Sequence, residues 1–413
     1  MTSVLIIGGR GFIGRHLAAA LTTAGHRVTA VGRDGIDLIR DNEADLAAKF
    51  AGHGLVVNAA GLVRSRGANS MAAVHAEGTE RLIHACCTAA VPRLIHLSAL
   101  GAAPDGQTAY QRTKGHAETV LAASTGLDWC VLRPSVVIGR SGASTALFSD
   151  LAALPLPIRI GPGTWTVQPV HVDDLAALVV RLVSWVGPLP RRIDVVGTEP
   201  MSTDTLTTAL RAWLDLPSRR FLAVPASLLG VVSILGERLK GGPVNRETLA
   251  MLKADNTASS APFADILGRA PQALPQALAR HSVSDADRLH ARLFFVQPIL
   301  RWSLALLWIV TGLLSFGLYP LADSYRLLGS VGLDGPLATL ALFGGAGLDL
   351  ILGFLLLVGW RPVAVGGAML ASVAAFSLLA AGLPAEHWTH PFAPLLKNLP
   401  IAAATLAMMA MES

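Results

Sequence analysis

The sequence is poor in charged residues for its length. Of its 413 residues, 15% are charged and 52% are hydrophobic, and the mean hydropathy is +0.52. So little charge argues against an ordinary soluble enzyme and indicates that part of the chain lies in a membrane. The net charge of +5 is not gathered in a Lys/Arg run or interleaved with aromatic residues. No nucleic-acid-binding face is therefore expected.

Cysteine is also scarce and occurs only as Cys86, Cys87 and Cys130. The chain has neither a disulfide pattern nor metal-ligand spacing, which predicts reduced thiols in a cytosolic domain and no metal site. The opening MTSVLIIGG lacks the basic start and the long apolar stretch of a signal peptide. It is typical of a buried strand, so the amino-terminal domain is expected to stay in the cytosol.

Residues 1–290 carry the pattern of an α/β domain. Strands are predicted over Val4–Ile7, Val28–Val31, Leu55–Asn58, Leu94–Leu97, Trp129–Leu132 and Arg192–Val196, and helices over Arg15–Thr23 and Thr79–Ala90. Apolar strands separated by helices indicate a Rossmann-type parallel sheet covered on both faces. A small substrate lobe is expected mainly within 141–290. A helix is predicted to begin at His171–Leu175, with Asp173 or Asp174 as its cap.

Four apolar stretches follow, near residues 298–319, 337–358, 362–383 and 392–411. Each is close to the ~20 residues needed to cross a bilayer, which predicts an all-α four-helix transmembrane bundle over 295–413. Arg288, Arg292, Arg301 and Arg361 lie on the side of the amino-terminal domain. Positive charge favours the cytoplasmic side. We therefore expect a multi-pass protein of a bacterial-type inner membrane, with both termini and the Rossmann domain in the cytoplasm.

The segment GGRGFIG, residues 8–14, follows the first predicted strand and opens a helix. Glycine permits a tight turn and a close approach of the backbone to a pyrophosphate, and the helix amino terminus offers free N–H groups. This context predicts a dinucleotide-binding turn. Its candidate binding residues are Gly8, Arg10, Gly11, Phe12, Ile13 and Gly14.

The end of the second strand bears on the choice of cofactor. Gly32 and Arg33 stand where a carboxylate would hold the ribose 2′-hydroxyl of NAD. Arg33, helped by Arg10, would instead meet a 2′-phosphate, which favours NADP over NAD. Asp34 keeps NAD open, and Arg33 as a solvated loop residue is the other interpretation. After the third strand, the small residues Asn58, Ala59, Ala60 and Gly61 would let the cofactor lie across the sheet edge.

Tyr110 and Lys114 are four positions apart and share one face of a predicted helix. A lysine cation beside a phenol lowers the tyrosine pKa, which suits a general acid/base, and the lysine can also bind the nicotinamide ribose. Ser98 ends the preceding strand, where its hydroxyl would either polarise a substrate carbonyl or cap the strand. Tyr110, Lys114 and Ser98 are the candidate catalytic residues.

With these motifs, residues 1–290 resemble the extended and atypical short-chain dehydrogenase/reductases, including the NAD-dependent epimerase/dehydratases and the nucleotide-binding accessory subunit of respiratory complex I. The resemblance rests on GGRGFIG, NAAG (58–61), LIHLSALGA (94–102), YQRTK (110–114), LRPSVVIG (132–139) and PVHVDDLA (169–176). It implies an NAD(P) cofactor, a Tyr/Lys/Ser catalytic set and a loop after Arg133-Pro134 near the nicotinamide. Extended members usually have further hydroxyls where this chain has Ala99 and Leu100.

The carboxyl-terminal stretches resemble the DoxX-like four-helix membrane family. RWSLALLWIVTG (301–312), Asp349 and LLKNLP (395–400) carry this likeness. Asp349 and Lys397 are ionisable groups in predicted spans, where such groups are costly and usually have partners. They are expected to form a functional site or a structural pair, or Lys397 snorkels to the interface.

The sequence thus predicts a membrane-anchored NAD(P)-dependent oxidoreductase that acts on the carbonyl or alcohol of a small molecule. Related epimerase or dehydratase chemistry fits the same residues. The bilayer is an expected partner and allows a lipophilic substrate. The alternative is a non-catalytic NAD(P)-binding structural or sensor module of a membrane protein complex. A third option gives the bundle a transport or redox-protective role of its own.

Overall fold

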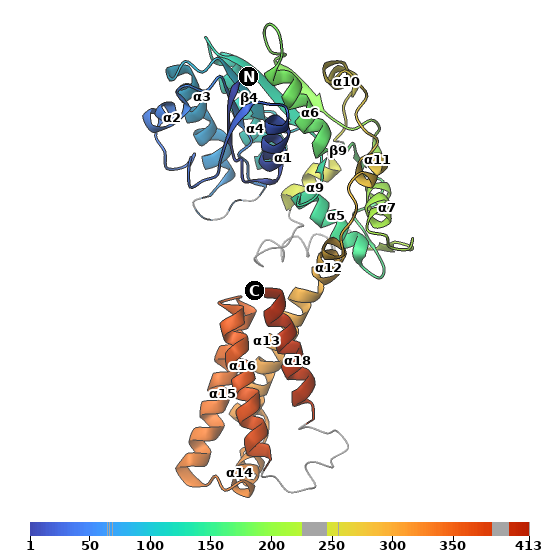
Figure 1. Cartoon of the computed structure of the whole chain (residues 1–413). Helices are drawn as coiled ribbons and strands as arrows, with labels where there is room; N and C mark the ends of the chain where they lie inside the picture. Colours follow the sequence, from blue (N-terminus) through green and yellow to red (C-terminus); the bar gives the residue numbers. More distant parts are fainter. Residues whose placement is uncertain are drawn as a thin grey trace. The chain divides into compact units, whose positions relative to one another are not determined.

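The computed structural model describes residues 1–63, 65, 67, 69–224, 246–254, 256–381 and 396–412 (Figure 1). The chain divides into two compact units, Met1–Ala291 and Arg292–Ser413. The two units are described separately below.

The first unit is built on a six-stranded parallel sheet. Its order is β10 (Arg192–Val195), β5 (Asp128–Pro134), β4 (Arg93–Leu97), β3 (Leu55–Asn58), β1 (Ser3–Ile7) and β2 (Arg27–Val31). The predicted strands and the parallel α/β fold are confirmed. The connection reverses direction between β1 and β3, and doubly wound sheets bind ligands at the carboxyl ends of the strands at such a point.

Helices cover both faces of the sheet (Figure 1). On one face, Leu17 and Leu21 of α1 (Phe12–Thr23) share a core with Leu178 of α6 (Val172–Val183). The other face is covered by α2 (Glu43–Phe50), α3 (Gly78–Thr88) and α4 (Ala109–Ala123). Burial on both faces explains why the central strands β1 and β3 are almost entirely apolar.

Smaller elements complete the first unit, and all but η1 follow β5 in the chain. They are the helices η1 (Ala72–Glu77, before α3), α5 (Ala143–Ala153), α7 (Thr203–Trp213), α9 (Arg246–Lys253), α10 (Ala261–Leu267), α11 (Leu274–Ala279) and α12 (Asp285–Leu293), and the strands β6 (Val137–Ile138), β7 (Ile158–Arg159), β8 (Thr166–Val167), β9 (Val170–His171), β11 (Met201–Ser202) and β12 (Leu222–Ala223). The predicted cap of α6 is wrong. Its N-cap is His171, whose Nδ1 accepts from the Asp173 backbone N–H, while Asp173 and Asp174 lie in the first turn.

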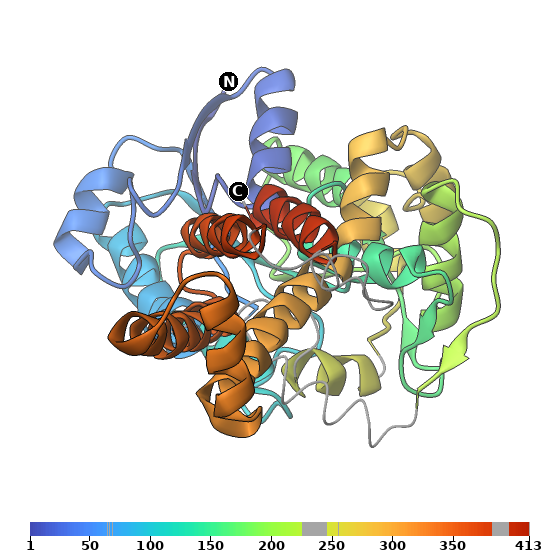
Figure 2. The same ribbon diagram turned by 90° about the horizontal axis from the view of Figure 1, so that it is seen from below.

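The second unit contains only helices among its described residues. They are α13 (Val296–Leu313), η2 (Leu314–Leu318), α14 (Leu321–Ser330), α15 (Gly335–Leu357), α16 (Pro362–Ala380) and α18 (Asn398–Glu412). Figure 2 views the long helices nearly end-on as a bundle. Leu304, Trp308, Leu356 and Met369 pack in its interior with Met408 of α18. At one end, Arg301 Nη1 lies 3.1 Å from Glu412 Oε1 and so joins the first helix to the last.

Large apolar side chains cover much of the outside of this bundle, including Leu306, Leu340, Phe354, Phe376 and Leu378. Three helical segments among the described residues are long and apolar enough to cross a membrane: Asp285–Leu318, Gly335–Leu357 and Pro362–Ala380. The predicted fourth span, 392–411, overlaps α18 and falls partly on residues outside those described. Helix α14 was not predicted.

Asp349 and Lys397 form no ion pair with each other in the described part of the bundle. Asp349 lies within α15, whereas Lys397 is exposed just before α18 begins. The interpretation of these two residues as a mutual pair is therefore wrong, because they lie in different parts of their segments.

Candidate active site

The glycine turn packs so closely that side chains do not fit at two of its positions. Gly8 has φ +76°, and a Cβ atom there would lie 2.7 Å from the Ala60 nitrogen. A Cβ atom at Gly14 would lie 2.2 Å from the Gly8 carbonyl oxygen. Gly9 adds a requirement that the motif did not reveal, since its Cβ would lie 2.7 Å from that of Ala30. Gly8 is thereby pressed against the loop after β3, and Gly9 against β2.

Gly11 differs from Gly8 and Gly14 because the surrounding protein leaves more room for a Cβ atom there. It is the N-cap of α1 with φ −72°, and a Cβ there would meet only the Gly8 oxygen, at 3.1 Å. The space beside Gly11 belongs to a cleft whose lining includes Gly8, Arg10, Gly32, Arg33, Ala59, Ala60 and Gly61. A bare backbone, helix N–H groups and two arginines at a cleft are what a dinucleotide pyrophosphate requires, so the residues present fit this group.

Phe12 and Ile13 take part in this turn through their backbone only. Their side chains pack against the core of the first unit. The Phe12 ring lies so near Gly142 that a Cβ there would be 2.9 Å away. Of the predicted binding residues, these two can offer a ligand only first-turn N–H groups.

Both arginines of the cleft have partners. Arg10 Nη2 lies 2.7 Å from Asp34 Oδ2, and the two side chains are largely exposed. Arg33 Nη1 donates to Asn69 Oδ1 at 3.0 Å. Arg10, Arg33 and Asp34 therefore lie on the same side of the cleft. The arginines would bind the 2′-phosphate of NADP there, and Asp34 would bind the ribose hydroxyl of NAD.

The loop after β3 connects the glycine turn to α4. Asn58 is buried, and its Oδ1 accepts from the Ala60 N–H at 3.1 Å, so this side chain shapes the loop. A Cβ atom at Gly61 would lie 3.6 Å from His75 Nε2 and 3.8 Å from Lys114 Nζ. The structure thus brings two predicted parts of the site together, the NAAG segment and the Tyr/Lys helix.

Helix α4 begins with a capping box formed by Thr108 and Gln111, which places Tyr110 and Lys114 on its first turns. The Lys114 ammonium donates to the Leu97 carbonyl at 2.6 Å. Burial lowers the pKa of Lys114 to about 8 and raises the pKa of Tyr110 to about 12. The predicted lowering of the Tyr110 pKa by Lys114 is therefore wrong in this structure, because loss of solvent dominates at the phenol.

Ser98 is part of a buried polar cluster at the end of β4. Its hydroxyl donates to Glu118 Oε1 at 2.5 Å. Glu118 also accepts from Arg133 Nε at 2.9 Å, and Arg133 Nη2 donates to the Ala102 carbonyl. The carbonyl of Pro134 accepts from the Leu100 N–H at 3.0 Å. Ser98 is thus engaged inside the protein, and a role in polarising a substrate stays a prediction.

His75 is a residue of the site that the sequence did not single out. It lies in η1, a π-helix, and such segments occur often at functional sites. Its Nε2 accepts from the Leu62 N–H at 2.8 Å, and its ring meets the Tyr110 ring edge-on at 5.3 Å between centroids. Burial and then the charge of Lys114 lower the pKa of His75 to about 2. A neutral imidazole therefore supports Tyr110, and no sequence spacing links the two residues.

A doubly wound sheet, a glycine turn at its switch point and a Tyr/Lys helix beside it define a dinucleotide-binding domain of the short-chain dehydrogenase/reductase type. Residues 4–195 match the model of the NAD dependent epimerase/dehydratase family. Residues 305–406 match that of the DoxX-like family. One stretch of the chain is thus similar to the epimerase/dehydratases, and a later one to the DoxX-like proteins. The resemblance to the complex I subunit stays a prediction.

Among curated proteins, a ceramide reductase and a hydroxysteroid dehydrogenase are similar to part of this chain. The chain is 29% identical over 192 residues to a ceramide reductase of Caulobacter vibrioides, covering 43% of this chain and 59% of the relative. It is 28% identical over 212 residues to a 3 beta-hydroxysteroid dehydrogenase/Delta 5-->4-isomerase of Mycobacterium tuberculosis, covering 42% of this chain and 57% of the relative. The chain therefore spans less than two thirds of the length of these relatives.

Among solved structures, a UDP-glucose 4-epimerase of Thermotoga maritima is similar in fold. The TM-score is 0.52 at 18% identity, and the match covers 71% of this chain and 98% of the epimerase. At this identity, the likeness shows a shared fold.

Proposed function

We propose that this protein is a membrane-anchored NAD(P)-dependent oxidoreductase that reduces the carbonyl group of a lipophilic substrate. The observation that carries the proposal is the meeting of three elements. The glycine turn packs on Ala60, Gly61 of the same loop adjoins Lys114, and Tyr110 lies one helical turn before Lys114. A nucleotide held by the turn thus extends toward an acid/base pair.

The cofactor supplies the hydride when it is bound. Tyr110 is a neutral phenol at pH 7, because burial raises its pKa to about 12. It can therefore donate a proton to a carbonyl oxygen, which is the step needed for reduction. Lys114, with a pKa of about 8, is mostly cationic at pH 7 and stabilises negative charge that develops on the phenol. The acid form of Tyr110 favours reduction over alcohol oxidation in our proposal.

For the cofactor, we propose NADP in preference to NAD. Arg33 and Arg10 both line the cleft beyond β2, where a 2′-phosphate would accept charge-assisted hydrogen bonds. Arg10 forms an ion pair with Asp34, so its charge is already compensated. Within the described residues, the side-chain partner of Arg33 is the neutral amide of Asn69. Arg33 is thus the cation best placed to exchange its partner for a phosphate.

We propose a lipophilic substrate because the domain is joined to a membrane bundle and because two relatives are named for enzymes of ceramide and of hydroxysteroids. The placement of arginines before the first span and between α15 and α16 supports a cytoplasmic position of the first unit at an inner membrane. The protein would then act on a carbonyl presented at the inner face of the bilayer.

The proposal is tested with the full chain in lipid nanodiscs. NADPH is titrated first, and its oxidation is then followed with long-chain keto-lipids in the bilayer and with short water-soluble ketones. We expect turnover of the lipid ketones that Tyr110→Phe abolishes and the matched control Tyr325→Phe retains. Equal rates in wild type and Tyr110→Phe would contradict the catalytic role of Tyr110.

A second function, a non-catalytic dinucleotide-binding module of a membrane complex, is favoured by one observation. The hydroxyl of Ser98 is bound to Glu118, and the next two residues, Ala99 and Leu100, have no hydroxyl. Under this alternative, the same experiment yields tight NADPH binding and no turnover of any carbonyl. If Gly11→Ala then lost NADPH binding, the measured consequence would be altered assembly with a partner protein and not a change in a catalytic rate.

A further inference from the structure

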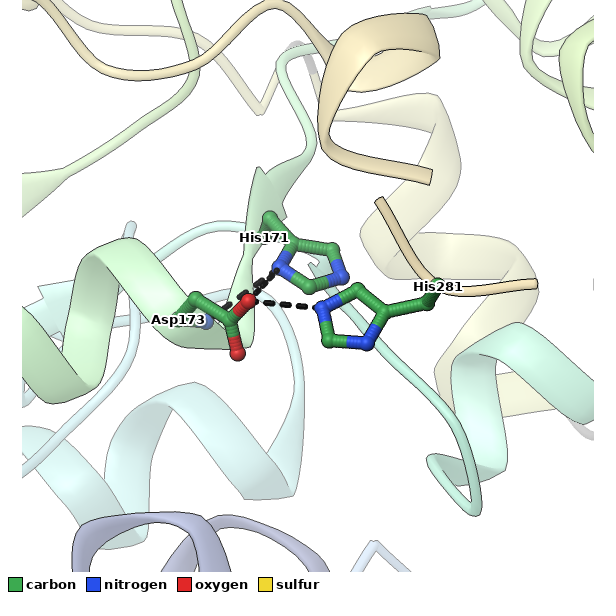
Figure 3. A group of neighbouring side chains, drawn as sticks. All are labelled: His171, Asp173 and His281. Carbon is green, nitrogen blue, oxygen red and sulfur yellow. Dashed lines mark hydrogen bonds and ion pairs between the residues drawn. The ribbon is translucent and has the colours of Figure 1, made fainter. Parts of the chain in front are cut away.

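Three side chains of types that can bind metal ions converge at the start of α6. They are His171, Asp173 and His281, and one donor atom of each lies within 4.8 Å of the others (Figure 3). His281 follows α11 and is more than a hundred residues from the other two in sequence. We propose that these three side chains bind a divalent transition-metal ion of the Zn²⁺ type.

The distances between donor atoms suit a single ion. Asp173 Oδ2 lies 3.4 Å from His171 Nδ1 and 2.7 Å from His281 Nε2. Ligands at about 2.1 Å from a tetrahedral zinc ion are about 3.4 Å apart. The first separation already has this value, and the second reaches it if the His281 ring moves by less than an ångström. Figure 3 shows both imidazole rings linked to Asp173.

His171 Nδ1 faces both a donor and an acceptor. The donor is the Asp173 N–H at 3.3 Å, and the acceptor is Asp173 Oδ2 at 3.4 Å. Either neutral tautomer of the ring satisfies one of these contacts and opposes the other. A metal ion bound by Nδ1 and Oδ2 would take the single lone pair of Nδ1, so coordination would replace the contact with the Asp173 N–H.

The surroundings hold the ligands in place and leave one side open. The His171 side chain is 2% exposed, whereas those of Asp173 and His281 are 39% and 43% exposed. The His281 carbonyl accepts from Trp213 Nε1 at 2.8 Å, which fixes its backbone. The rings of His171 and His281 stack at 5.0 Å between centroids. Water can therefore reach the fourth coordination position.

The position of Asp173 beside two histidines is not explained by a need to hold α6 against the segment before α11. Its neighbour Asp174 is fully buried and already ties α6 to the segment before α11, through the Gln272 N–H at 2.7 Å and the Arg269 guanidinium. Two imidazoles and one carboxylate with an open position match the ligand preference of zinc and exclude magnesium or calcium, which prefer oxygen alone.

The experiment uses the full, tag-free chain in detergent, in a Cys87→Ser background that removes the exposed thiol. Zn²⁺ is titrated against a fluorescent chelator, and Co²⁺ is titrated as a spectroscopic substitute. We expect one ion per chain, d–d bands without thiolate charge transfer, and an increase in melting temperature with Zn²⁺. His281→Ala and Asp173→Asn should each weaken Zn²⁺ binding at least tenfold.

His290→Ala is the matched control, because His290 is an exposed histidine of the neighbouring helix α12 outside the cluster. It should bind Zn²⁺ as the parent does. Equal affinity in His281→Ala and the parent would overturn the proposal, as would loss of binding in His290→Ala alone. A folded parent that takes up no Zn²⁺ or Co²⁺ at micromolar concentrations would also overturn it.

Discussion

The two halves of the candidate site, one for the cofactor and one for the reaction, are built on different principles. On the cofactor half, Gly8, Gly9 and Gly14 hold backbone against backbone, with no room for a methyl group. On the reacting half, Lys114, Ser98 and Glu118 are buried polar groups whose hydrogen bonds end on other parts of the protein. The first half is shaped by steric exclusion, and the second by polar networks.

This difference separates binding from chemistry. Closely packed backbone has no space for added atoms, so the cofactor half is expected to be rigid and intolerant of substitution. Polar groups that are satisfied internally must exchange partners before they meet a substrate. The reacting half is therefore where activity can be lost while the fold and nucleotide binding persist.

Lys114→Met should have the largest effect on activity and break the reacting half alone. We expect turnover to fall by about 10²–10⁴-fold, the usual contribution of an acid/base group. The free energy of unfolding should not fall, because burial disfavours the lysine cation in the folded state. Steady-state rates and chemical denaturation measure the two effects. A parallel loss of stability and rate would contradict this separation.

The same substitution has a signature in the pH dependence of stability. The pKa of Lys114 is lowered from 10.5 to about 8 on folding, so between these pH values the unfolded chain binds more protons. Stability from this group therefore rises as pH increases through that window. Denaturation curves across it should lose this component in Lys114→Met. If the difference in the free energy of unfolding between wild type and Lys114→Met stayed the same from pH 7 to pH 11, the lowered pKa of Lys114 would be contradicted.

Gly14→Ala and Gly11→Ala separate packing from ligand approach within the cofactor half. The added methyl group at Gly14 would lie 2.2 Å from the Gly8 oxygen, and overpacking of this kind costs about 1–3 kcal/mol. At Gly11 it meets only that oxygen at 3.1 Å, so we expect little change in melting temperature but weaker NADPH binding. Equal destabilisation by both substitutions would show that Gly11 is also needed for packing.

Arg33→Ala tests which nucleotide the cofactor half selects. Loss of a charge-assisted hydrogen bond to a 2′-phosphate costs about 1.5–3 kcal/mol, or roughly tenfold or more in affinity for NADPH. Affinity for NADH should hardly change. Titration of both nucleotides into Arg33→Ala and the wild type gives the ratio. A similar loss for both nucleotides would contradict the proposed selection of NADP.

Ser98→Ala should have the smallest effect on rate. The structure engages this hydroxyl with Glu118, so we expect a loss of about 1 kcal/mol in stability, as for a typical hydrogen bond, and a rate within a few-fold of wild type. Thermal unfolding and turnover are measured together. A hundredfold loss of turnover with unchanged stability would instead make Ser98 catalytic.

The sheet could be predicted because each of its strands is a local apolar run ended by turn residues. The β3 strand, Leu55–Asn58, was found at its observed bounds for this reason. The cap of α6 was not, because aspartates are usual caps and a histidine accepting from a backbone N–H has no distinctive local pattern. Helix α14 is short and amphipathic and lies between two apolar spans, so a search for long apolar stretches did not predict it.

The site could be predicted in part for the same reason. Gly8, Gly14, Tyr110 and Lys114 lie within short motifs whose spacing carries their geometry. His75 reaches Tyr110 only through the tertiary fold. Burial raises the pKa of Tyr110 through the packing around it, which a pair of residues on one helix cannot reveal.

The contact of Arg301 with Glu412 bears on how the second unit is made in the cell. These residues belong to the first and last helices of the bundle. During synthesis the arginine side chain enters the assembling bundle long before its counterion leaves the ribosome. A chain interrupted before Glu412 would therefore keep all of α13, α15 and α16 and still hold Arg301 without this partner.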